Sequence, residues 1–416
     1  MASASNGLSE PLRLPLAWMF GALAAGAIAG WALAGTAVIG RLLPVTETIG
    51  TLWLHALQMT ILPLVASLLV TGLSRMVETA RAGATARRTV LAFIAVLAGG
   101  TLVSALAMPA LLAAFPIPEA AQAALTAVPG QSQEVPGIAA FMLSLVSPNL
   151  VAAAAENAML PLIVFFALLA LAIARLPADQ RDLLVGFFAA LGNAMLIVIG
   201  WILRLAPIGI FALAVGVAAR SGGEVFAALG HYIAVVASMG LVVLLGAYAL
   251  AVLVARRSLP DFEKAALPAQ SVALSTQSSL ASLPAMLAAC RKLGVGETTA
   301  EFVLPLAVAV FRATSPGMNL AVAIYVAKLT GVALTPQAIA AGAAVALLTT
   351  VGSVSLPGTI SFIASTGPIA LSMGVPLGPL ALLVAVEMLP DMMRTLGNVT
   401  MDIAVTASVD QAQQDN

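Results

Sequence analysis

Charge, cysteine and histidine are all scarce in this sequence, and each shortage excludes a class of protein or site. Only 9% of the 416 residues are charged, against roughly 25% in soluble domains, which excludes a soluble globular domain. A single cysteine, Cys290, excludes an internal disulfide, and the two histidines, His55 and His231, are too few for a histidine-rich metal cluster. The formal net charge is zero, so no nucleic-acid partner is expected. No cofactor is expected either.

Apolar sequence is abundant instead, with 61% hydrophobic residues and a mean hydropathy of +1.06. A hydrocarbon core of about 30 Å needs about 20 apolar residues per helical span. Runs of this kind lie at about 14–34, 51–73, 89–114, 158–175, 183–203 and 228–255. They are continuous and rich in Ala, Leu and Gly, unlike the roughly ten-residue alternating segments of a transmembrane barrel. The predicted fold class is therefore an all-α membrane protein. The first run is longer than the apolar region of a cleaved signal, so it is predicted to stay as a span.

Positive charge predicts the orientation. The loops after the second, fourth and sixth runs hold Arg75, Arg81, Arg87, Arg88, Arg175, Arg181, Arg256, Arg257 and Lys264. The intervening loops hold only Arg41, Arg204 and Arg220. Because loops rich in Lys and Arg stay in the cytoplasm, both termini are predicted to be cytoplasmic, in a multi-pass protein of the inner (plasma) membrane. The polar residues 409–416 are expected to form a disordered cytoplasmic tail.

From about residue 265 the apolar pattern is interrupted at short range. The stretches "ALSTQSSLASLPAMLAACRKLG" (273–294) and "LTTVGSVSLPGTISFIASTG" (348–367) each place Ser and Thr around a Leu-Pro pair. Their flanks are too short to cross a membrane, so each is predicted to be a re-entrant hairpin with a polar, proline-containing tip. Between them, residues 302–329 are predicted to form a helix interrupted at Pro316-Gly317. Such interrupted segments indicate a transporter's binding site, although Gly, Pro and Ser also assist helix packing in lipid.

The last apolar stretch carries a polar stripe. At about 100° per residue, one helix face about 100° wide holds Glu387, Asp391, Arg394, Thr395, Asn398 and Asp402. Charges at membrane depth mark substrate or ion pathways. The alternative is a self-neutralising packing cluster, such as Asp391 with Arg394 three residues later. Three carboxylates against one arginine do not balance, however, so a ligand site is the preferred interpretation.

The residue types in the stripe suit a small zwitterion with an acidic side chain. The Asp391 carboxylate can bind an ammonium group, and the planar Arg394 guanidinium can bind a carboxylate through two parallel hydrogen bonds. Thr395 and Asn398 can complete the polar shell. The predicted ligand is an acidic amino acid.

Motifs between about residues 143 and 408 resemble those of the dicarboxylate/amino acid:cation symporters, the glutamate transporter family. In order, they are "SPNLVAAAAENAMLPLIVFFALLALAI", "LAPIGIFAL", "STQSSLASLP", "FVLPL", "GSVSLPG" and "DMMRTLGNVTMD". The resemblance implies eight transmembrane helices, two re-entrant helical hairpins and a homotrimer with an elevator mechanism. It also implies one membrane domain, 1–410, with a scaffold part (mainly 11–75 and 136–220) and a transport part (mainly 86–115 and 225–408).

The same resemblance implies a substrate site residue by residue. Its members would be Ser279, Ser315, Gly358, Asp391, Arg394, Thr395 and Asn398. In the family pattern, Asp391 binds the substrate ammonium and Arg394 binds its side-chain carboxylate. Family members that carry dicarboxylates usually lack the carboxylate, and members that select neutral amino acids usually lack the arginine. The presence of both favours aspartate or glutamate.

The chain departs from the family at the interrupted helix. Where the family reads Asn-Met-Asp-Gly-Thr, with an Asn and an Asp that help to bind sodium, this chain reads Phe311, Arg312, Ala313, Thr314 and Ser315. A hard cation needs several oxygen ligands, so part of the sodium site is lost, although Asp402, also assigned to sodium by the family, remains. Arg312 is therefore predicted to replace a sodium ion, most simply by pairing with Asp402. The alternatives are a residual sodium site at Asp402 and an Arg312 that snorkels to water.

The predicted function is secondary transport of aspartate or glutamate, independent of sodium. Transport would be exchange or proton-coupled, with Glu387 or Glu156 carrying the proton. The alternative within the class is a sodium-coupled symporter of acidic amino acids or C4-dicarboxylates, and an ion channel is the alternative of another class. An enzyme is not expected, because the sequence has no H-E-x-x-H motif and no histidine near the hairpin serines. The expected partners are the acidic amino acid, membrane lipid and the other subunits of a homotrimer.

Overall fold

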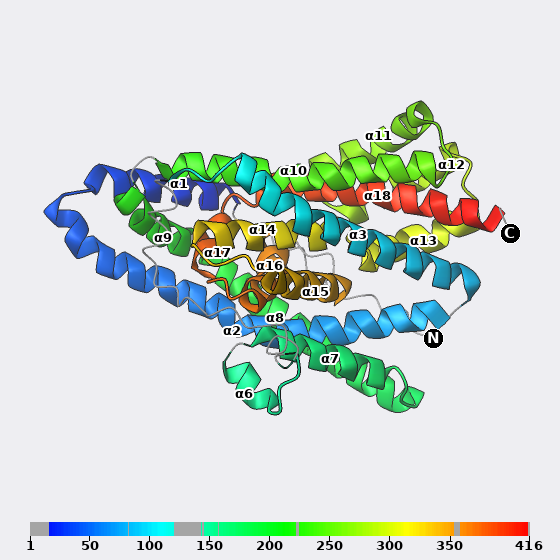
Figure 1. Ribbon diagram of the computed structural model, residues 1–416, viewed down its shortest axis with the longest axis horizontal. Helices are drawn as coiled ribbons and strands as arrows, with labels where there is room; N and C mark the ends of the chain where they lie inside the picture. Colours follow the sequence, from blue (N-terminus) through cyan, green and yellow to red (C-terminus); the bar gives the residue numbers. More distant parts are fainter. Residues whose placement is uncertain are drawn as a thin grey trace.

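The computed structural model of the chain describes residues 16–81, 83–119, 143, 145–156, 158–221, 224–352 and 358–414. Within these residues all regular elements are α-helices (Figure 1), which confirms the all-α fold class. The helices are α1 Leu16–Leu33, α2 Ala37–Arg81, α3 Ala84–Ala114, α6 Leu150–Ala155, α7 Met159–Ile173, α8 Ala178–Arg204, α9 Ala206–Ser221, α10 Glu224–Leu253, α11 Leu259–Thr276, α12 Ser279–Lys292, α13 Glu297–Val310, α14 Ser315–Leu329, α15 Pro336–Gly352, α16 Gly358–Ser372, α17 Gly378–Leu383 and α18 Met388–Gln414.

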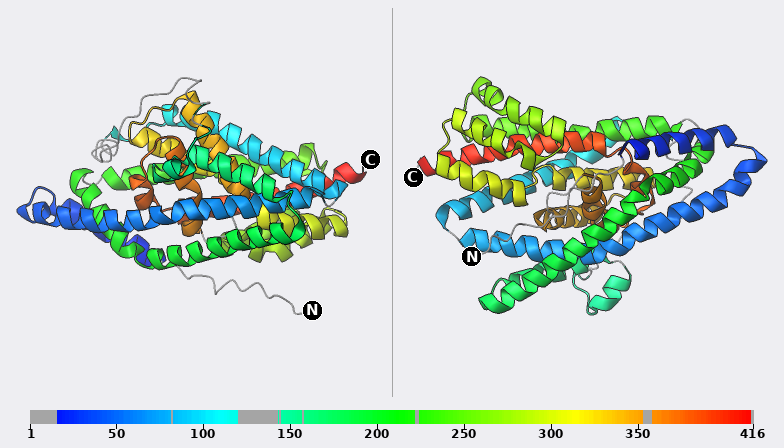
Figure 2. Two further views of the ribbon diagram at one scale, coloured as in Figure 1. Left: turned by 90° about the horizontal axis from the view of Figure 1, so that it is seen from below. Right: turned by 180° about the vertical axis from the view of Figure 1, so that it is seen from behind.

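Several helices have the length and apolar character of membrane spans. Among the described residues, these stretches are Ala37–Thr79, Ala84–Ala114, Ala178–Arg204, Ala227–Leu253 and Glu297–Leu329. Four of the runs expected from the sequence coincide with them, and the runs at 14–34 and 158–175 coincide with the shorter apolar helices α1 and α7. The long helices lie roughly along the longest axis of the molecule in all views (Figures 1 and 2).

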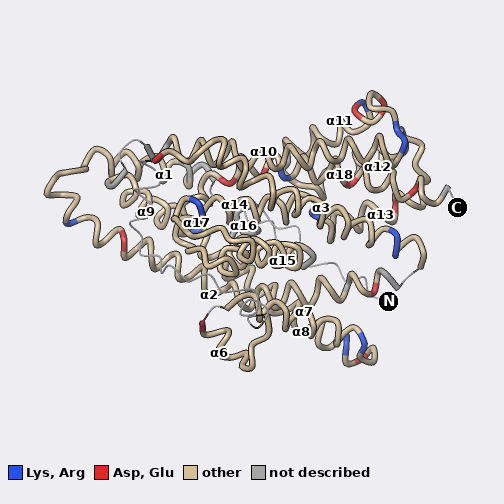
Figure 3. Tube along the Cα trace, viewed as in Figure 1, with Lys and Arg blue, Asp and Glu red and all other residues tan. Residues whose placement is uncertain are grey.

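The outward faces of these helices are apolar. Large apolar side chains that are exposed include Trp18, Trp31, Leu106, Leu183 and Trp201, from α1, α3 and α8. A water-soluble surface would not carry so many large apolar groups. Charged residues gather instead toward helix ends, most densely at the end of the molecule that holds α11, α12, α13 and the α7–α8 turn (Figure 3). A surrounding lipid phase accounts for both features.

Glycine residues allow helices α1 and α9 to pack closely. Helix α1 packs along α9, and α2 packs against α7, α8 and α9. At the α1–α9 contact, a Cβ on Gly26 would lie 2.6 Å from the Phe211 carbonyl oxygen, and one on Gly30 would lie 2.4 Å from that of Val215. Only glycine permits backbones to approach so closely, which is the usual device of helix packing in lipid.

The back half packs around α14 and α18. All residues of α14 except Lys328 are buried, and this helix lies in the middle of the molecule (Figure 1). It contacts α3, α10, α15 and α16, while α18 runs along α10 and also contacts α11, α12 and α13. The polar stripe on α18 is thus enclosed by helices rather than turned toward lipid.

Both predicted hairpins have two short helices in contact with each other. The first consists of α11 and α12, and the second of α15 and α16. In the first hairpin the turn lies at Gln277, which adopts a left-handed conformation (φ 51°), and Ser278, whose side chain accepts a hydrogen bond from the Ala281 N–H at 3.2 Å. The expectation of a tip at Leu283-Pro284 is wrong: Ser278 is the N-cap of α12, so the proline lies inside that helix. The tip of the second hairpin, at residues 353–357, lies outside the described residues.

The last helix is longer than expected. Residues 409–414 were predicted to be disordered, but α18 continues to Gln414. The Asp410 carboxylate accepts a hydrogen bond from the Gly296 N–H at 3.1 Å and lies 3.9 Å from Arg257 Nη2. Gln413 bonds the hydroxyls of Thr299 and Thr85. These contacts order a polar segment that hydropathy alone predicts to be disordered. Residues 415 and 416 lie outside the described part of the chain.

Candidate functional site

The interruption of the broken helix forms one wall of the site. Helix α13 ends at Val310 and α14 begins at Ser315, so the break lies at residues 311–314, just before the predicted Pro316-Gly317. Pro316 instead occupies the first turn of α14, where its missing N–H costs no hydrogen bond. Phe311 is buried and stacks on Phe93 of α3, with ring centroids 4.2 Å apart and an interplanar angle of 7°.

Helix α18 satisfies the polar backbone of this break. The Thr314 N–H donates to Asn398 Oδ1 at 2.9 Å, and the Thr314 hydroxyl lies 2.9 Å from the same oxygen and 3.2 Å from the Arg394 carbonyl oxygen. Non-helical backbone at membrane depth is stable only when protein groups or water bond it. The predicted site residue Asn398 therefore has a structural partner, Thr314, that the sequence pattern did not indicate.

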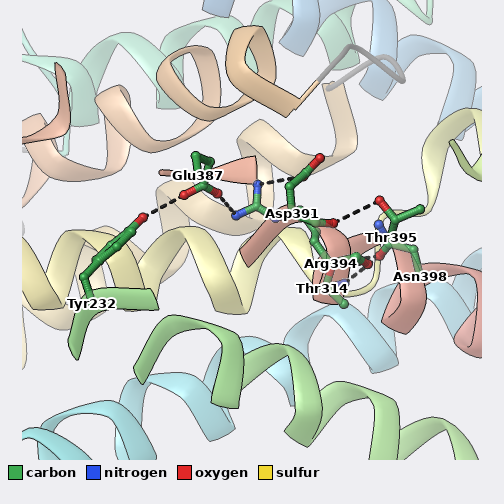
Figure 4. A network of polar contacts seen from close by, with 7 residues as sticks. All are labelled: Tyr232, Thr314, Glu387, Asp391, Arg394, Thr395 and Asn398. Carbon is green, nitrogen blue, oxygen red and sulfur yellow. Dashed lines mark hydrogen bonds and ion pairs between the residues drawn. The ribbon is translucent and has the colours of Figure 1, made fainter. Parts of the chain in front are cut away.

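The charged centre of the site lies at the start of α18, with Glu387 immediately before the helix and Asp391 and Arg394 on its first turns (Figure 4). Arg394 Nη2 donates to Glu387 Oε1 at 2.7 Å, and Arg394 Nη1 lies 3.8 Å from Asp391 Oδ1. All three side chains are buried, with 1% of Glu387 and 1% of Arg394 exposed. The structure thus brings together three residues of the predicted stripe. The ion pair considered as the alternative, Asp391 with Arg394, is present, but the shorter contact is to Glu387.

Tyr232 of α10 completes this cluster, and the sequence analysis missed it. Its hydroxyl donates to Glu387 Oε2 at 2.7 Å (Figure 4), across 155 positions of sequence. The only signal was a tyrosine inside the apolar run 228–255, since a buried tyrosine hydroxyl usually has a hydrogen-bond partner. Each oxygen of Glu387 is therefore held by a different donor, Tyr232 or Arg394.

Arg394 keeps donors that this cluster does not use. In the described part of the chain, its Nε and Nη1 atoms are buried and have no hydrogen-bond partner. Each of these two donors can bond one carboxylate oxygen, and each forms a parallel pair only with Nη2, the atom that Glu387 occupies. The arrangement can therefore bind an anionic carboxylate at Arg394 with Asp391 close enough to bind an ammonium group of the same molecule.

The other predicted substrate residues lie on four different helices, α12, α14, α16 and α18. The Thr395 hydroxyl donates to the Asp391 carbonyl oxygen at 3.0 Å, one turn back on α18. Ser315 is buried at the start of α14. Ser279 and Gly358 are the first residues of α12 and α16, at the hairpin tips. Their part in a substrate site stays a prediction.

Arg312 and Asp402 do not form the expected ion pair. Both carboxylate oxygens of Asp402 are buried without a hydrogen-bond partner in the described residues. The charges that act on the partly buried Arg312 guanidinium are Asp391, which attracts it, and Arg394, which repels it. At 1.5 Å per helical residue, Asp402 lies about 16 Å along α18 from Asp391, so one guanidinium cannot reach both. The prediction that Arg312 pairs with Asp402 is therefore wrong.

Glu156, the other acidic residue considered for proton transfer, lies elsewhere. It is the C-terminal cap of the short helix α6 and is exposed. Glu156 was considered because burial at membrane depth favours a protonated carboxyl, but its side chain is not buried. Of the two acidic residues, only Glu387 is buried, between Arg394 and Tyr232.

The fold and this site define a membrane transporter, and comparison with known proteins gives its family. Residues 16–412 match the model of the sodium:dicarboxylate symporter family, and the chain belongs to that family. This is a family of secondary transporters, not of enzymes, and its members work in the plasma membrane. The resemblance inferred from the sequence motifs is confirmed.

Three relatives show the range of the family. The chain is 29% identical to the proton/glutamate-aspartate symporter of Escherichia coli (strain K12), over 84% of this chain and 81% of that one. It is 27% identical to the proton/sodium-glutamate symport protein of Bacillus subtilis (strain 168), over 85% and 83%. It is 24% identical to C4-dicarboxylate transport protein 1 of Pseudomonas aeruginosa (strain UCBPP-PA14), over 69% and 63%. Relatives thus differ in both substrate and coupling ion.

Proposed function

We propose that this protein transports aspartate or glutamate across the plasma membrane. The observation that carries the proposal is the buried Arg394, which has two donors without hydrogen-bond partners and lies beside Asp391. A C4-dicarboxylate has no ammonium group to match Asp391, so an acidic amino acid fits the pair better. The Escherichia coli and Bacillus subtilis relatives are named for glutamate or aspartate, which supports an amino acid substrate. The Pseudomonas aeruginosa relative, named for C4-dicarboxylates, is less similar in sequence.

The proposed mechanism is an elevator in a homotrimer of chains with eight transmembrane helices and two re-entrant hairpins. The packing supports a division into two parts: α1, α2, α7, α8 and α9 contact one another, while α18 packs with α10, α11, α12 and α13. The site lies wholly within the second group and its neighbour α14. A part that encloses its own site can carry substrate as a rigid body.

Sodium independence is proposed from the break between α13 and α14. Two of its buried positions are apolar, Phe311 and Ala313, and neither offers an oxygen ligand from its side chain. Arg312 contributes a permanent positive charge close to Asp391. In this proposal Arg312 still replaces a cation, but as the partner of Asp391 rather than of Asp402.

Charge balance supports proton coupling at Glu387. The buried cluster holds the carboxylates of Glu387 and Asp391 and the guanidiniums of Arg312 and Arg394, so its charges cancel when Glu387 is ionised. Aspartate adds one negative charge, and a net charge in a buried site is costly. One proton on Glu387 restores neutrality and frees Arg394 for the substrate carboxylate. The carrier would then take up one proton with each anion.

Uptake of radiolabelled aspartate into proteoliposomes tests these proposals together. Sodium is replaced by choline on both sides, and an inward proton gradient is imposed or omitted. We expect accumulation with the proton gradient alone. Accumulation only with an inward sodium gradient would refute sodium independence and leave the transporter assignment intact. Saturable uptake of neither aspartate nor glutamate, with continuous ion conduction instead, would favour a channel.

A sodium-coupled symporter is the second candidate, because of Asp402. Its carboxylate is 1% exposed, and both oxygens lack hydrogen-bond partners within the described residues. A buried carboxylate of this kind is either protonated or compensated by a cation. In the same assay, sodium-driven uptake that is lost in Asp402→Asn would support this candidate.

A further inference from the structure

A basic cavity opens at the end of the molecule where α10 leads into the first hairpin. Its volume is about 420 Å³, and its lining residues are Arg256, Arg257, Ser258, Asp261, Lys264, Ala265, Lys292 and Leu293. These come from the α10–α11 connection, the first turns of α11 and the last turn of α12. Four of the lining side chains are cationic and one is anionic. The cavity is distinct from the substrate site, since none of the site residues lines it.

The two carboxylates near the cavity, Asp261 and Asp410, are already bonded to other groups of the protein. The Ser258 hydroxyl donates to Asp261 Oδ2 at 2.5 Å and accepts from the Asp261 N–H at 3.2 Å, which caps the N-terminus of α11. Asp410 accepts from the Gly296 N–H and lies 3.9 Å from Arg257 Nη2. Arg257 Nε and Nη2 nevertheless remain buried without a hydrogen-bond partner in the described residues. The cavity thus has a positive excess and unused donors, and it lies at a helix N-terminus that itself favours anions.

Exposed apolar side chains lie close in sequence to the residues that line the cavity. Leu253 and Val254 precede its arginines, and Leu259 follows Ser258; these side chains are 77%, 50% and 52% exposed. The positive-inside pattern predicts that this end of the molecule faces the cytoplasm. A cavity that joins cationic donors to exposed apolar side chains at the membrane surface suits a molecule with an anionic head and apolar chains.

We propose that this cavity binds a phosphate ester, supplied by the headgroup of an anionic phospholipid. Arginine and lysine donors at the floor bind the phosphate oxygens, and the acyl chains lie along Leu253, Val254 and Leu259. Because the lining comes from both α11 and α12, the bound headgroup joins the two arms of the first hairpin to the end of α10. The proposal stands independently of the transported substrate.

Native mass spectrometry of the intact protein tests the proposal, with phosphatidylglycerol, phosphatidylcholine and inorganic phosphate as separate probes. We expect preferential binding of phosphatidylglycerol. The double variant Lys264→Gln/Lys292→Gln should weaken it by at least about tenfold, since each basic residue near a membrane surface contributes to anionic-lipid binding. The matched control is Arg87→Gln/Arg291→Gln, which removes the same charge at the same end of the molecule but outside the cavity, and it should retain binding.

Each outcome decides the question. Loss in the cavity variant but not in the control supports the proposal. Inorganic phosphate that binds with the same mutational loss, without lipid binding, supports a phosphate site and refutes the lipid source. Equal loss in both variants, or loss in neither, overturns the proposal. Thermal unfolding in detergent at the same temperature as the unaltered protein verifies that both variants are folded, so a failed transport proposal would remain distinguishable from a failed lipid site.

Discussion

In the proposed function, Arg394 is the residue on which recognition of the substrate carboxylate depends most directly. Replacement by lysine keeps the charge but removes the planar guanidinium, whose donors match the geometry of a carboxylate. We expect Arg394→Lys to weaken aspartate binding by about tenfold to a hundredfold, from the loss of one charge-assisted hydrogen bond. Isothermal titration calorimetry of purified protein measures the change. Thermal unfolding in detergent is the control for folding; unchanged aspartate affinity in a folded Arg394→Lys variant would contradict the assigned role.

Under the proposed proton coupling at Glu387, we expect the affinity for aspartate to depend on pH. When ionised it bonds Arg394 Nη2 at 2.7 Å, with Tyr232 on its other oxygen and Asp391 nearby, so it competes with the substrate carboxylate. We expect aspartate affinity to fall as pH rises, by at most about tenfold per pH unit for one linked proton. In Glu387→Gln the affinity should be nearly independent of pH, and proton-driven accumulation should be absent.

The control for this prediction is Tyr232→Phe, which removes a hydrogen bond but keeps the carboxylate. It should retain pH-dependent binding. A flat pH profile in Tyr232→Phe, or an unchanged profile in Glu387→Gln, would mean that the linked proton binds elsewhere.

Arg312 tests the proposed replacement of a cation. Removal of its charge leaves Asp391 less compensated and gives the buried cluster a negative excess that opposes an anionic substrate. We expect Arg312→Ala to weaken aspartate binding by about tenfold or more, and Arg312→Lys to recover most of the loss. Calorimetry with sodium or choline measures both effects. Unchanged affinity in Arg312→Ala would favour a guanidinium that only snorkels to water.

At the scale of elements, the contact between α18 and the α13–α14 break is the tightest constraint on the site. A Cβ on Gly397 would lie 2.6 Å from Thr314 Cγ2, so alanine there forces the two elements apart. We expect Gly397→Ala to destabilise the protein by about 1–3 kcal/mol and to weaken aspartate binding, because the Thr314–Asn398 bonds shift. Thermal unfolding in detergent measures the first effect and calorimetry the second.

Gly99 on α3 provides the matched control, because a Cβ there would meet nothing within 4 Å. Gly99→Ala should leave stability unchanged or raise it by up to about 1 kcal/mol, as expected for an open helical glycine. Equal stability of the two variants would show that the α18 contact tolerates movement.

At the scale of the whole molecule, the charge of the cluster determines how transport responds to voltage. In the proposed mechanism one proton accompanies one substrate anion, so the empty site with Glu387 ionised and the loaded site with Glu387 protonated carry the same net charge. We expect a potassium diffusion potential of either sign to leave the initial rate of aspartate uptake unchanged within about twofold. A strong dependence on potential would show that further charge moves, such as sodium bound at Asp402.

Hydropathy and periodicity were enough to predict much of the architecture. Apolar runs predicted helices that are long and apolar enough to cross a membrane. Short polar interruptions predicted the helix pairs α11–α12 and α15–α16 and the broken helix α13–α14. The spacing of polar residues also predicted that Glu387, Asp391 and Arg394 share one buried face. These features follow from local chemistry, because burial in lipid requires an apolar helix and any polar group along it stands out in the sequence.

The partners of these residues were decided only by the tertiary structure. Glu387 bonds Tyr232, Asn398 bonds Thr314, and the carboxylate oxygens of Asp402 have no hydrogen-bond partner in the described residues. The end of α18 is likewise ordered by Gly296 and Thr299. Each of these contacts joins segments far apart in the chain, and which groups meet depends on how the helices pack. The sequence by itself therefore determined which side chains are buried in the membrane, and only the packing of α10, α14 and α18 decided which of them neutralise one another.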